Sequence, residues 1–533
     1  MGIYVNPGND NFNMVVHSKI YVDKTGLIEY TNGVIGTEQR WVCVSRPRRF
    51  GKSIAAEMLT AYYGKGCDSS KLFQLYMIAG TENFEKHLNQ YDVIHLDITD
   101  FRRPGDNSGD MLRRINKEVI AELRKVYPGI LREDEENLPY ALACLNESAR
   151  AEFVFIIDEW DAIFREKKSD LTEQKEYVEL LRGLFKGSAS KKFIKLAYLT
   201  GILPVKKYGT ESALNNFYEF TMINPKSLSK YVGFTEDEVR SLCKKYDMDY
   251  EEMKRWYDGY SFRKMKHIYN PNSVVQAILM QEYDSYWSKT ETYESLKNYI
   301  SMNFDGLKDA VVRVLVGETC KVNTDSFEND VTSFKSRDDV LTVLIHLGYL
   351  AYDRDRREVY IPNEEIRSAF SNAVQKSDWS PVARAIQLSE RLLEATWRMD
   401  CDAVAKGIGQ VHMSNISMLA YNDENALSCV ITLAYYNAVN DYIMRREMPA
   451  GKGYADVVFI PRRYSDKPTM IVELKYGKSA KEAIRQIKDR EYVKGVEGCE
   501  GKVLLVGVNY ERETKEYECL IEEWDKKDRV GIE

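Results

Sequence analysis

Residues 45–53, SRPRRFGKS, are the most informative segment of the N-terminal part. It follows an apolar run, Trp41–Ser45, that predicts a buried strand, and it precedes a run with helical spacing. A turn between a strand and a helix directs backbone N–H groups at a phosphate, while a lysine and a hydroxyl reach its oxygens and Mg²⁺. We therefore expect Gly51, Lys52 and Ser53 to form the end of a P-loop that binds ATP and Mg²⁺.

One residue departs from the regular P-loop pattern, because Arg46 stands where the first glycine is usual. We expect the neighbouring Arg48 and Arg49 to bind the phosphates of the nucleotide. Two other roles stay open for this cluster: an arginine finger, or a basic loop that faces acidic neighbours. The departure at Arg46 also leaves open a site that binds ATP and hydrolyses it poorly.

A second apolar run, Phe153–Asp158, predicts a strand that ends in two carboxylates. Asp158 is expected to hold Mg²⁺ through its water shell, and Glu159 to polarise the attacking water, since ligands bind at the carboxyl edge of such sheets. Thr200 ends a further strand candidate and is expected to contact the γ-phosphate. Either motif alone could be a plain buried strand or a chance match, but together and in this order they predict an ATPase.

Alternating strands and helices over residues 15–225 predict a parallel α/β sheet, with the remaining strand candidates at Tyr91–Ile98 and Ile194–Thr200. Residues 226–410 are mostly helical, and a helix followed by two short strands at about 335–370 indicates a winged-helix element. From residue 411 the order is helix, three strands, helix, two strands. The domains expected are an AAA-like P-loop ATPase (1–225), a helical lid region (226–410) and a nuclease-like domain (411–533).

The composition is typical of a globular protein and indicates an intracellular location. The chain has 533 residues, 44% hydrophobic and 29% charged, with a net charge of −7, so any surface for nucleic acid must be local. Nine scattered cysteines with no zinc spacing predict a reducing, cytoplasmic location. The longest apolar stretch, residues 340–352, is too short to cross a bilayer, and the first residues have no export or lipid-anchor pattern, so no membrane partner is expected.

A second constellation of charged residues lies near the C-terminus. Side chains alternate along a strand, so Glu473 and Lys475 share one face of the apolar run 470–475. If Asp456 lies on the same face of the preceding strand, two carboxylates meet beside an ammonium group. This arrangement suits Mg²⁺ that stabilises charge on a scissile phosphate, with Lys475 orienting or activating water. A solvated strand face is the alternative.

The helix that follows presents a basic stripe. Its members recur at intervals of three, four and three residues and therefore share one helical face: Lys478, Lys481, Arg485 and Lys488. Such a stripe beside a metal site would bind the phosphates of a nucleic acid. An ordinary solvated helix face remains the alternative.

These motifs resemble those of bacterial AAA-ATPase-like proteins fused to a PD-(D/E)XK nuclease-type domain. The resemblance is carried by YVDKT (21–25), RPRRFGKS (46–53), Asp158-Glu159, LTGIL (199–203), WYDGY (256–260), YNP (269–271), GKG (451–453), Asp456, Glu473-x-Lys475, KSA (478–480) and QIK (486–488). It implies an α/β multidomain fold in which RPRRFGKS is the usual form of the P-loop. It also implies that Glu424, with Glu447 as a rival, completes the metal site, and that Gln486 joins the basic residues at the nucleic acid.

The function expected is an ATP-binding and ATP-hydrolysing protein that controls a Mg²⁺-dependent nuclease acting on nucleic acid, with DNA as the expected substrate. The alternative is an ATP-driven switch whose C-terminal domain binds nucleic acid or a protein without cutting, which the acidic net charge favours. A homo-oligomer is compatible with both readings.

Overall fold

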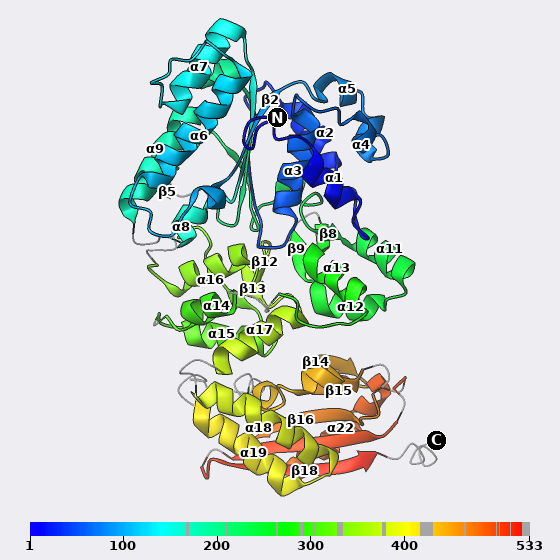
Figure 1. The fold of residues 1–533 in the computed structure, drawn as a ribbon. Helices are drawn as coiled ribbons and strands as arrows, with labels where there is room; N and C mark the ends of the chain where they lie inside the picture. Colours follow the sequence, from blue (N-terminus) through cyan, green and yellow to red (C-terminus); the bar gives the residue numbers. More distant parts are fainter. Residues whose placement is uncertain are drawn as a thin grey trace. The chain divides into compact units, whose positions relative to one another are not determined.

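The computed structural model describes residues 1–166, 170–205, 207–208, 211–212, 214–262, 265–287, 292–302, 304–327, 334–375, 380–415, 430–462, 465–496, 498–499, 501–511 and 513–524. The chain divides into two compact units (Figure 1). The first comprises Met1–Thr292 and Thr319–Arg367, and the second comprises Tyr293–Glu318 and Ser368–Glu533.

The first unit is built on a parallel five-stranded sheet with the strand order β2-β3-β4-β1-β7. Its strands are β1 (Trp41–Ser45), β2 (Asp92–Asp97), β3 (Phe153–Asp158), β4 (Ile194–Gly201) and β7 (Tyr218–Phe220). β1 and β3 are buried along their whole length, as expected for near-continuous apolar runs covered by helices on both faces. The prediction of a parallel α/β sheet from these runs is confirmed.

Helices cover both faces of this sheet, with α6, α7 and α9 on one side and α1, α2 and α3 on the other (Figure 1). The core on the first side joins apolar residues of α6, α7 and α9 to β1, β2 and β3. The helices and the short hairpin strands around the sheet are α1 (Asp10–Val16), α2 (Gly26–Val34), α3 (Lys52–Tyr63), α4 (Ser70–Phe73), α5 (Phe84–His87), α6 (Asp110–Val126), α7 (Leu138–Ala149), α8 (Ala162–Glu166), α9 (Leu171–Phe185), α10 (Ser190–Phe193), β5 (Lys207–Tyr208) and β6 (Glu211–Ser212).

The rest of the first unit is mostly helical, with two small antiparallel sheets. The first sheet has the order β8-β10-β9, and the second has the order β11-β13-β12 directly after α16. The elements are β8 (Phe234–Thr235), α11 (Glu236–Tyr246), α12 (Tyr250–Tyr257), β9 (Tyr260–Phe262), β10 (Met265–Tyr269), α13 (Pro271–Met280), β11 (Cys320–Lys321), α16 (Arg337–Leu347), β12 (Ala351–Asp353) and β13 (Glu358–Tyr360).

The second unit holds a mixed five-stranded sheet, β14-β15-β16-β17-β18, in which only the β16–β17 pair is parallel. The strands are β14 (Tyr442–Ala450), β15 (Gly453–Pro461), β16 (Thr469–Tyr476), β17 (Val503–Glu511) and β18 (Glu516–Trp524). α22 (Ala480–Asp489) connects the two parallel strands and packs Ile484 and Ile487 against the sheet. The expected order of three strands, a helix and two strands is confirmed, and the helix expected ahead of them falls partly outside the described residues.

The remaining helices of this part of the chain are α14 (Thr292–Ile300), α15 (Leu307–Leu315), α17 (Glu364–Gln375), α18 (Ser380–Trp397), α19 (Cys401–Asn415) and α21 (Ala438–Asp441). α17 starts in the first unit and ends in the second. None of the helices in the described ranges is long and apolar enough to span a membrane.

Candidate functional sites

The loop between β1 and α3 has the geometry of a phosphate cradle. Gly51 has a φ of 86°, a left-handed conformation that favours glycine, and it caps the N-terminus of α3. Lys52 is only 5% exposed, and its Nζ donates to the Pro47 carbonyl at 3.1 Å. Burial lowers the pKa of Lys52 below its ordinary value, although nearby carboxylates act in the opposite direction. The helix N-terminus and the ammonium group together suit an anion.

The carboxyl ends of β3 and β4 bring Asp158 and Thr200 to the same edge of the sheet as this loop. Asp158 is buried and accepts a hydrogen bond from Ser53, while burial raises its pKa to about 6. The Thr200 hydroxyl is buried and finds no hydrogen-bond partner in the part of the chain that the structure describes. Because an orphaned buried hydroxyl is costly, Thr200 fits a group that gains a partner from a ligand.

Glu159 lies between two cations. Its Oε1 is 3.8 Å from Lys52 Nζ, and its Oε2 accepts a hydrogen bond from Arg165 Nη2. Its backbone φ of 48° is unusual for a residue with a side chain, and such strain concentrates at functional sites. Glu159 is thus held at the point where the loop and β3 meet.

The three arginines of the loop have different surroundings. Arg46 is fully buried and donates to the carbonyls of Ser45 and Phe220, so its side chain faces the sheet. Arg49 donates to the Tyr286 carbonyl, whereas Arg48 is exposed and makes no ion pair with any described residue. Arg48 and Arg49 both line the adjoining pocket.

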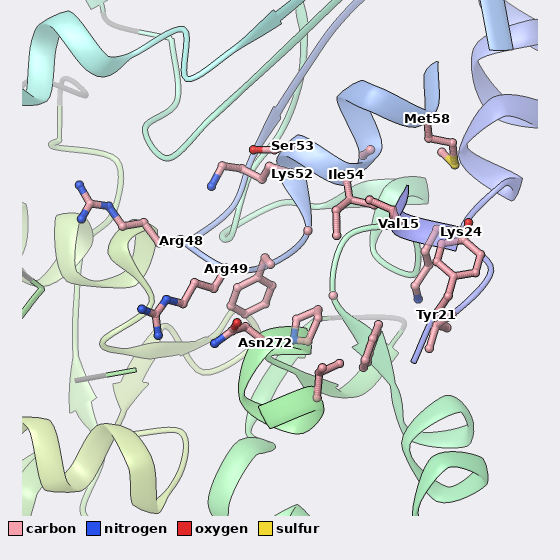
Figure 2. A pocket seen from close by; sticks show the side chains of 18 of the residues that line it. Val15, Tyr21, Lys24, Arg48, Arg49, Lys52, Ser53, Ile54, Met58 and Asn272 are labelled. Atoms are coloured by element: carbon pink, nitrogen blue, oxygen red, sulfur yellow. The ribbon is translucent and has the colours of Figure 1, made fainter. Parts of the chain in front are cut away.

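That pocket has a volume of about 720 Å³ and extends from the loop to the N-terminal segment of the chain. Figure 2 shows Lys52, Ser53, Arg48 and Arg49 at one end and Val15, Tyr21, Lys24 and Met58 at the other. Apolar side chains also line it, among them Ile20, Val22, Ile54, Val275 and Leu279. A basic end for phosphates, together with apolar lining residues for a base, suits a nucleotide.

Ser53 and Asp158 also line a second pocket of about 400 Å³. Further carboxylates line this pocket, among them Glu57, Asp97 and Asp100. Oxygen donors of this kind suit Mg²⁺, and the hydroxyl and carboxylate that would hold it already contact each other. The residues present therefore fit a nucleotide with Mg²⁺.

A second site lies on β15 and β16 of the second unit. Glu473 is 1% exposed, and its Oε1 accepts hydrogen bonds from Lys475 Nζ at 2.8 Å and from Gln486 Nε2. Burial, followed by the charge of Asp456, raises the pKa of Glu473 to about 7. Gln486 also donates to the Tyr492 hydroxyl at 3.2 Å. A carboxylate, an ammonium group and an amide therefore meet in a buried place beside Asp456.

The donor set at this site fits a divalent cation. Glu473 Oε2 is buried and has no hydrogen-bond partner among the described residues, which leaves an acceptor for a ligand. Asp456 Oδ2 accepts from the backbone N–H of Leu474 at 2.7 Å, which fixes the carboxylate next to Glu473. No group of three metal-ligating side chains gathers within the described ranges, and Glu424 lies outside them. Glu447, its rival, is exposed on β14.

Three members of the predicted basic stripe lie on α22, whereas Lys478 precedes the N-cap Ser479 and is not on the helical face. The four members of the stripe are all exposed: Lys478, Lys481, Arg485 and Lys488. Lys488 donates to Glu522, so that cation is partly neutralised. Gln486 is half-buried, and its amide donates to Glu473 and Tyr492.

Sequence reasoning missed three residues that the structure places at the sites: Asp161, Arg165 and Tyr492. Asp161 and Arg165 are four residues apart just after Glu159, a spacing that pairs side chains on a helix and was a usable signal. Tyr492 follows the end of α22, and its contact with Gln486 depends on a turn that periodicity does not predict.

Two family models match this chain, one over each of the two sites described above. Residues 8–210 match the family described as predicted AAA-ATPase, and residues 422–520 match the PD-(D/E)XK nuclease superfamily. The chain therefore joins an AAA-ATPase-like domain to a domain of the PD-(D/E)XK nuclease superfamily. No curated protein matches the sequence.

Several solved structures are similar to this chain, including the following three. The ORC2 protein of Aeropyrum pernix, in ADPNP and ADP complexes, is 12% identical with a TM-score of 0.32, over 67% of this chain and 96% of that one. Cdc6p from Pyrobaculum aerophilum is 12% identical with a TM-score of 0.26, over 69% and 98%. A replication initiator DnaA bound to AMPPCP and single-stranded DNA is 11% identical with a TM-score of 0.26, over 72% and 92%.

Proposed function

We propose that this protein binds and hydrolyses ATP and that its ATPase domain controls a Mg²⁺-dependent nuclease domain acting on DNA. The observation that carries the proposal is the pairing, in one chain, of a pocket with a phosphate end and the buried Asp456, Glu473 and Lys475 cluster with an orphaned carboxylate oxygen. Either site alone would support a narrower function.

In the ATPase, Lys52 and the N-terminus of α3 bind the β- and γ-phosphates, and Ser53 with Asp158 holds Mg²⁺. The base lies against the apolar wall that α13 and the segment around Tyr21 supply. Glu159 accepts a proton from the attacking water, and Thr200 hydrogen-bonds the γ-phosphate. Arg48 and Arg49 add positive charge at the phosphate end.

In the nuclease, Asp456 and Glu473 hold Mg²⁺, with Glu424 as a proposed third ligand. The metal supplies charge stabilisation at the scissile phosphate. Lys475 orients the attacking water, and Gln486 fixes the Glu473 carboxylate through the hydrogen bond to Oε1. Lys478, Lys481, Arg485 and Lys488 bind the backbone phosphates on either side.

Several coarser expectations belong to the same proposal. The domain limits at residues 225 and 410 stay predictions, as do the cytoplasmic location, the bacterial origin and a homo-oligomer. α16 followed by the ribbon β12–β13 supports a winged-helix element, a module suited to duplex DNA.

The test is Mg²⁺-dependent cleavage of single- and double-stranded DNA and RNA, with and without ATP. We expect Glu473→Gln to abolish cleavage while ATP binding persists, and Lys52→Ala to abolish ATP binding. The matched controls are Glu482→Gln and Lys71→Ala, both at exposed positions. Undiminished cleavage by Glu473→Gln would exclude the nuclease site.

The second candidate is an ATP-driven switch whose C-terminal domain binds without cutting. The net charge of −7 and the pairing of Lys488 with Glu522 favour it, because both weaken the attraction for a polyanion. ATP turnover with no cleavage of any substrate by the wild type, and with ATP-dependent binding that survives Glu473→Gln, would select this candidate.

A further inference from the structure

Arg165, at the phosphate end of the nucleotide pocket, has no role in the function proposed above. It lies on α8, its side chain is 9% exposed, and it lines the same pocket as Lys52 and Ser53. Its Nη2 donates to Glu159 and its Nε donates to Asp161 Oδ2 at 3.0 Å. One guanidinium therefore joins the proposed catalytic carboxylate to a second acidic residue.

The Glu159 carboxylate occupies a position suited to a phosphate. It bridges Lys52 and Arg165, with one oxygen toward each cation. The terminal phosphate of ATP is also an anion, and Lys52 is the residue expected to bind its oxygens. If a phosphate replaces the Glu159 carboxylate at Lys52, it also lies within reach of the Arg165 guanidinium, because both cations contact that carboxylate.

Asp161 holds one side of the Arg165 guanidinium in place. Its carboxylate is fully buried and accepts the backbone N–H groups of Ile202 and Leu203, at distances from 2.8 to 3.2 Å, directly after β4. Asp161 thus anchors the Nε side of the guanidinium to the strand that carries Thr200. The Nη2 side can exchange one anion for another while the arginine keeps its anchor.

We propose that Arg165 is a catalytic residue of the ATPase: its guanidinium exchanges Glu159 for the terminal phosphate of ATP. The exchange frees the Glu159 carboxylate and puts a positive charge on the phosphate oxygens. A water oxygen then bonds to the γ-phosphorus as the bond from that phosphorus to the β–γ bridging oxygen breaks. Glu159 takes the water proton, and ADP and phosphate are the products.

This inference rests on the proposed ATPase and adds a specific consequence. ADP has no γ-phosphate to attract the guanidinium, so Arg165 stays with Glu159 when ADP is bound. Arg165 therefore discriminates between ATP and ADP. It acts on the nucleotide bound by its own chain.

The experiment uses the full chain with Arg165→Gln and Arg165→Lys, both of which keep a donor for Asp161. Single-turnover hydrolysis and the affinities for a non-hydrolysable ATP analogue and for ADP are measured. We expect Arg165→Gln to slow hydrolysis by about 10³-fold. The same change should lower the affinity for the ATP analogue and leave the affinity for ADP unchanged. Arg165→Lys should recover part of the loss. Arg113→Gln, at an exposed arginine, is the control.

Hydrolysis by Arg165→Gln at or above the wild-type rate would overturn the proposal, because the arginine would then only restrain Glu159. Equal loss of ATP-analogue and ADP affinity would overturn it as well. If the wild type binds no ATP, or if Lys52→Ala and Glu159→Gln leave turnover unchanged, the ATPase assignment itself fails. If the wild type binds without hydrolysis, an unaltered ratio of the two affinities in Arg165→Gln rejects the inference.

Discussion

At the scale of single residues, the loop departs from the glycine-rich motif because its side chains have partners. Arg46 fills the glycine position and reaches the Phe220 carbonyl of β7 at 2.9 Å, with its guanidinium 5.4 Å from the Phe262 ring. Its Nε and Nη2 have no partner within the described residues, and burial lowers the pKa of Arg46 to about 10. Arg46 therefore joins the loop to the sheet.

Restoring the glycine of the regular motif should harm the protein. We expect Arg46→Gly to lower the free energy of unfolding by about 3 kcal/mol or more, because it opens a cavity and leaves the Phe220 carbonyl without its donor. Denaturant unfolding measures the change. The control, Arg48→Gly at an exposed position of the same loop, should cost no more than about 1 kcal/mol. Higher stability in Arg46→Gly would contradict this account.

A buried carboxylate close to the loop gives a pH dependence. Glu365 accepts hydrogen bonds from the Ser273 hydroxyl and from the backbone N–H groups of Tyr286 and Trp287. Burial raises the pKa of Glu365 to about 7, against the opposing effects of these hydrogen bonds and of Arg49. Between about pH 4.5 and 7, the folded state thus holds a proton that the unfolded chain has already released.

The pKa in the folded state lies above the ordinary value of 4.5, so this contribution to stability is complete below about pH 4.5 and is lost as the pH rises through about 7. Glu365→Gln keeps the shape and does not titrate. We expect the unfolding free energy of the wild type, relative to this variant, to fall by up to about 3 kcal/mol across that range. Unfolding series at several pH values measure it. A difference that is constant with pH would refute the assignment.

At the scale of elements, the apolar runs determined most of what could be predicted. The runs that formed β1 and β3 are long, continuous and bounded, so they match the structure at their predicted residues. β7 has three residues and no such pattern. Period two also placed Glu473 and Lys475 on one face of β16, where they form an ion pair. Tyr492 could not be found this way, since its contact with Gln486 depends on a turn, and the signal for Arg165 was its spacing of four residues from Asp161.

A glycine between α12 and β9 is required by close packing. Gly259 has a φ of 110°, and a Cβ there would lie 2.0 Å from the Pro362 carbonyl oxygen. We expect Gly259→Ala to lower the free energy of unfolding by about 2 kcal/mol or more, as measured by thermal unfolding. In contrast, Gly33 lies within α2 with open space around it, so Gly33→Ala should stabilise the protein by about 0.5–1 kcal/mol. Equal effects of the two changes would contradict the packing argument.

At the scale of the whole molecule, the two units are not contiguous in sequence. Tyr293–Glu318 belongs with the second unit, although the chain returns to the first unit at Thr319. A contact such as Arg446 with Glu318 joins distant parts of the second unit. Periodicity reports local structure, so an exchange of this kind cannot be predicted from one sequence.

Every residue that lines the nucleotide pocket belongs to the first unit. We expect calorimetry to resolve separate transitions for the two units and ATP with Mg²⁺ to shift only one of them. Ligand at about 100 times its Kd should add about 2.7 kcal/mol to that transition. Lys52→Ala should remove the shift and leave the second transition in place. A nucleotide-dependent shift of both transitions would show that the units unfold together.

The P-loop is anchored before any nucleotide arrives. Pro47 packs against Gly348, Arg49 bonds the Tyr286 carbonyl, and the Phe50 ring lies 5.3 Å from that of Tyr260. The entropy that a free loop loses when it closes on a phosphate has therefore been lost during folding. Nucleotides should associate at a rate set by diffusion and charge, so that their differences in affinity reside in how slowly they leave.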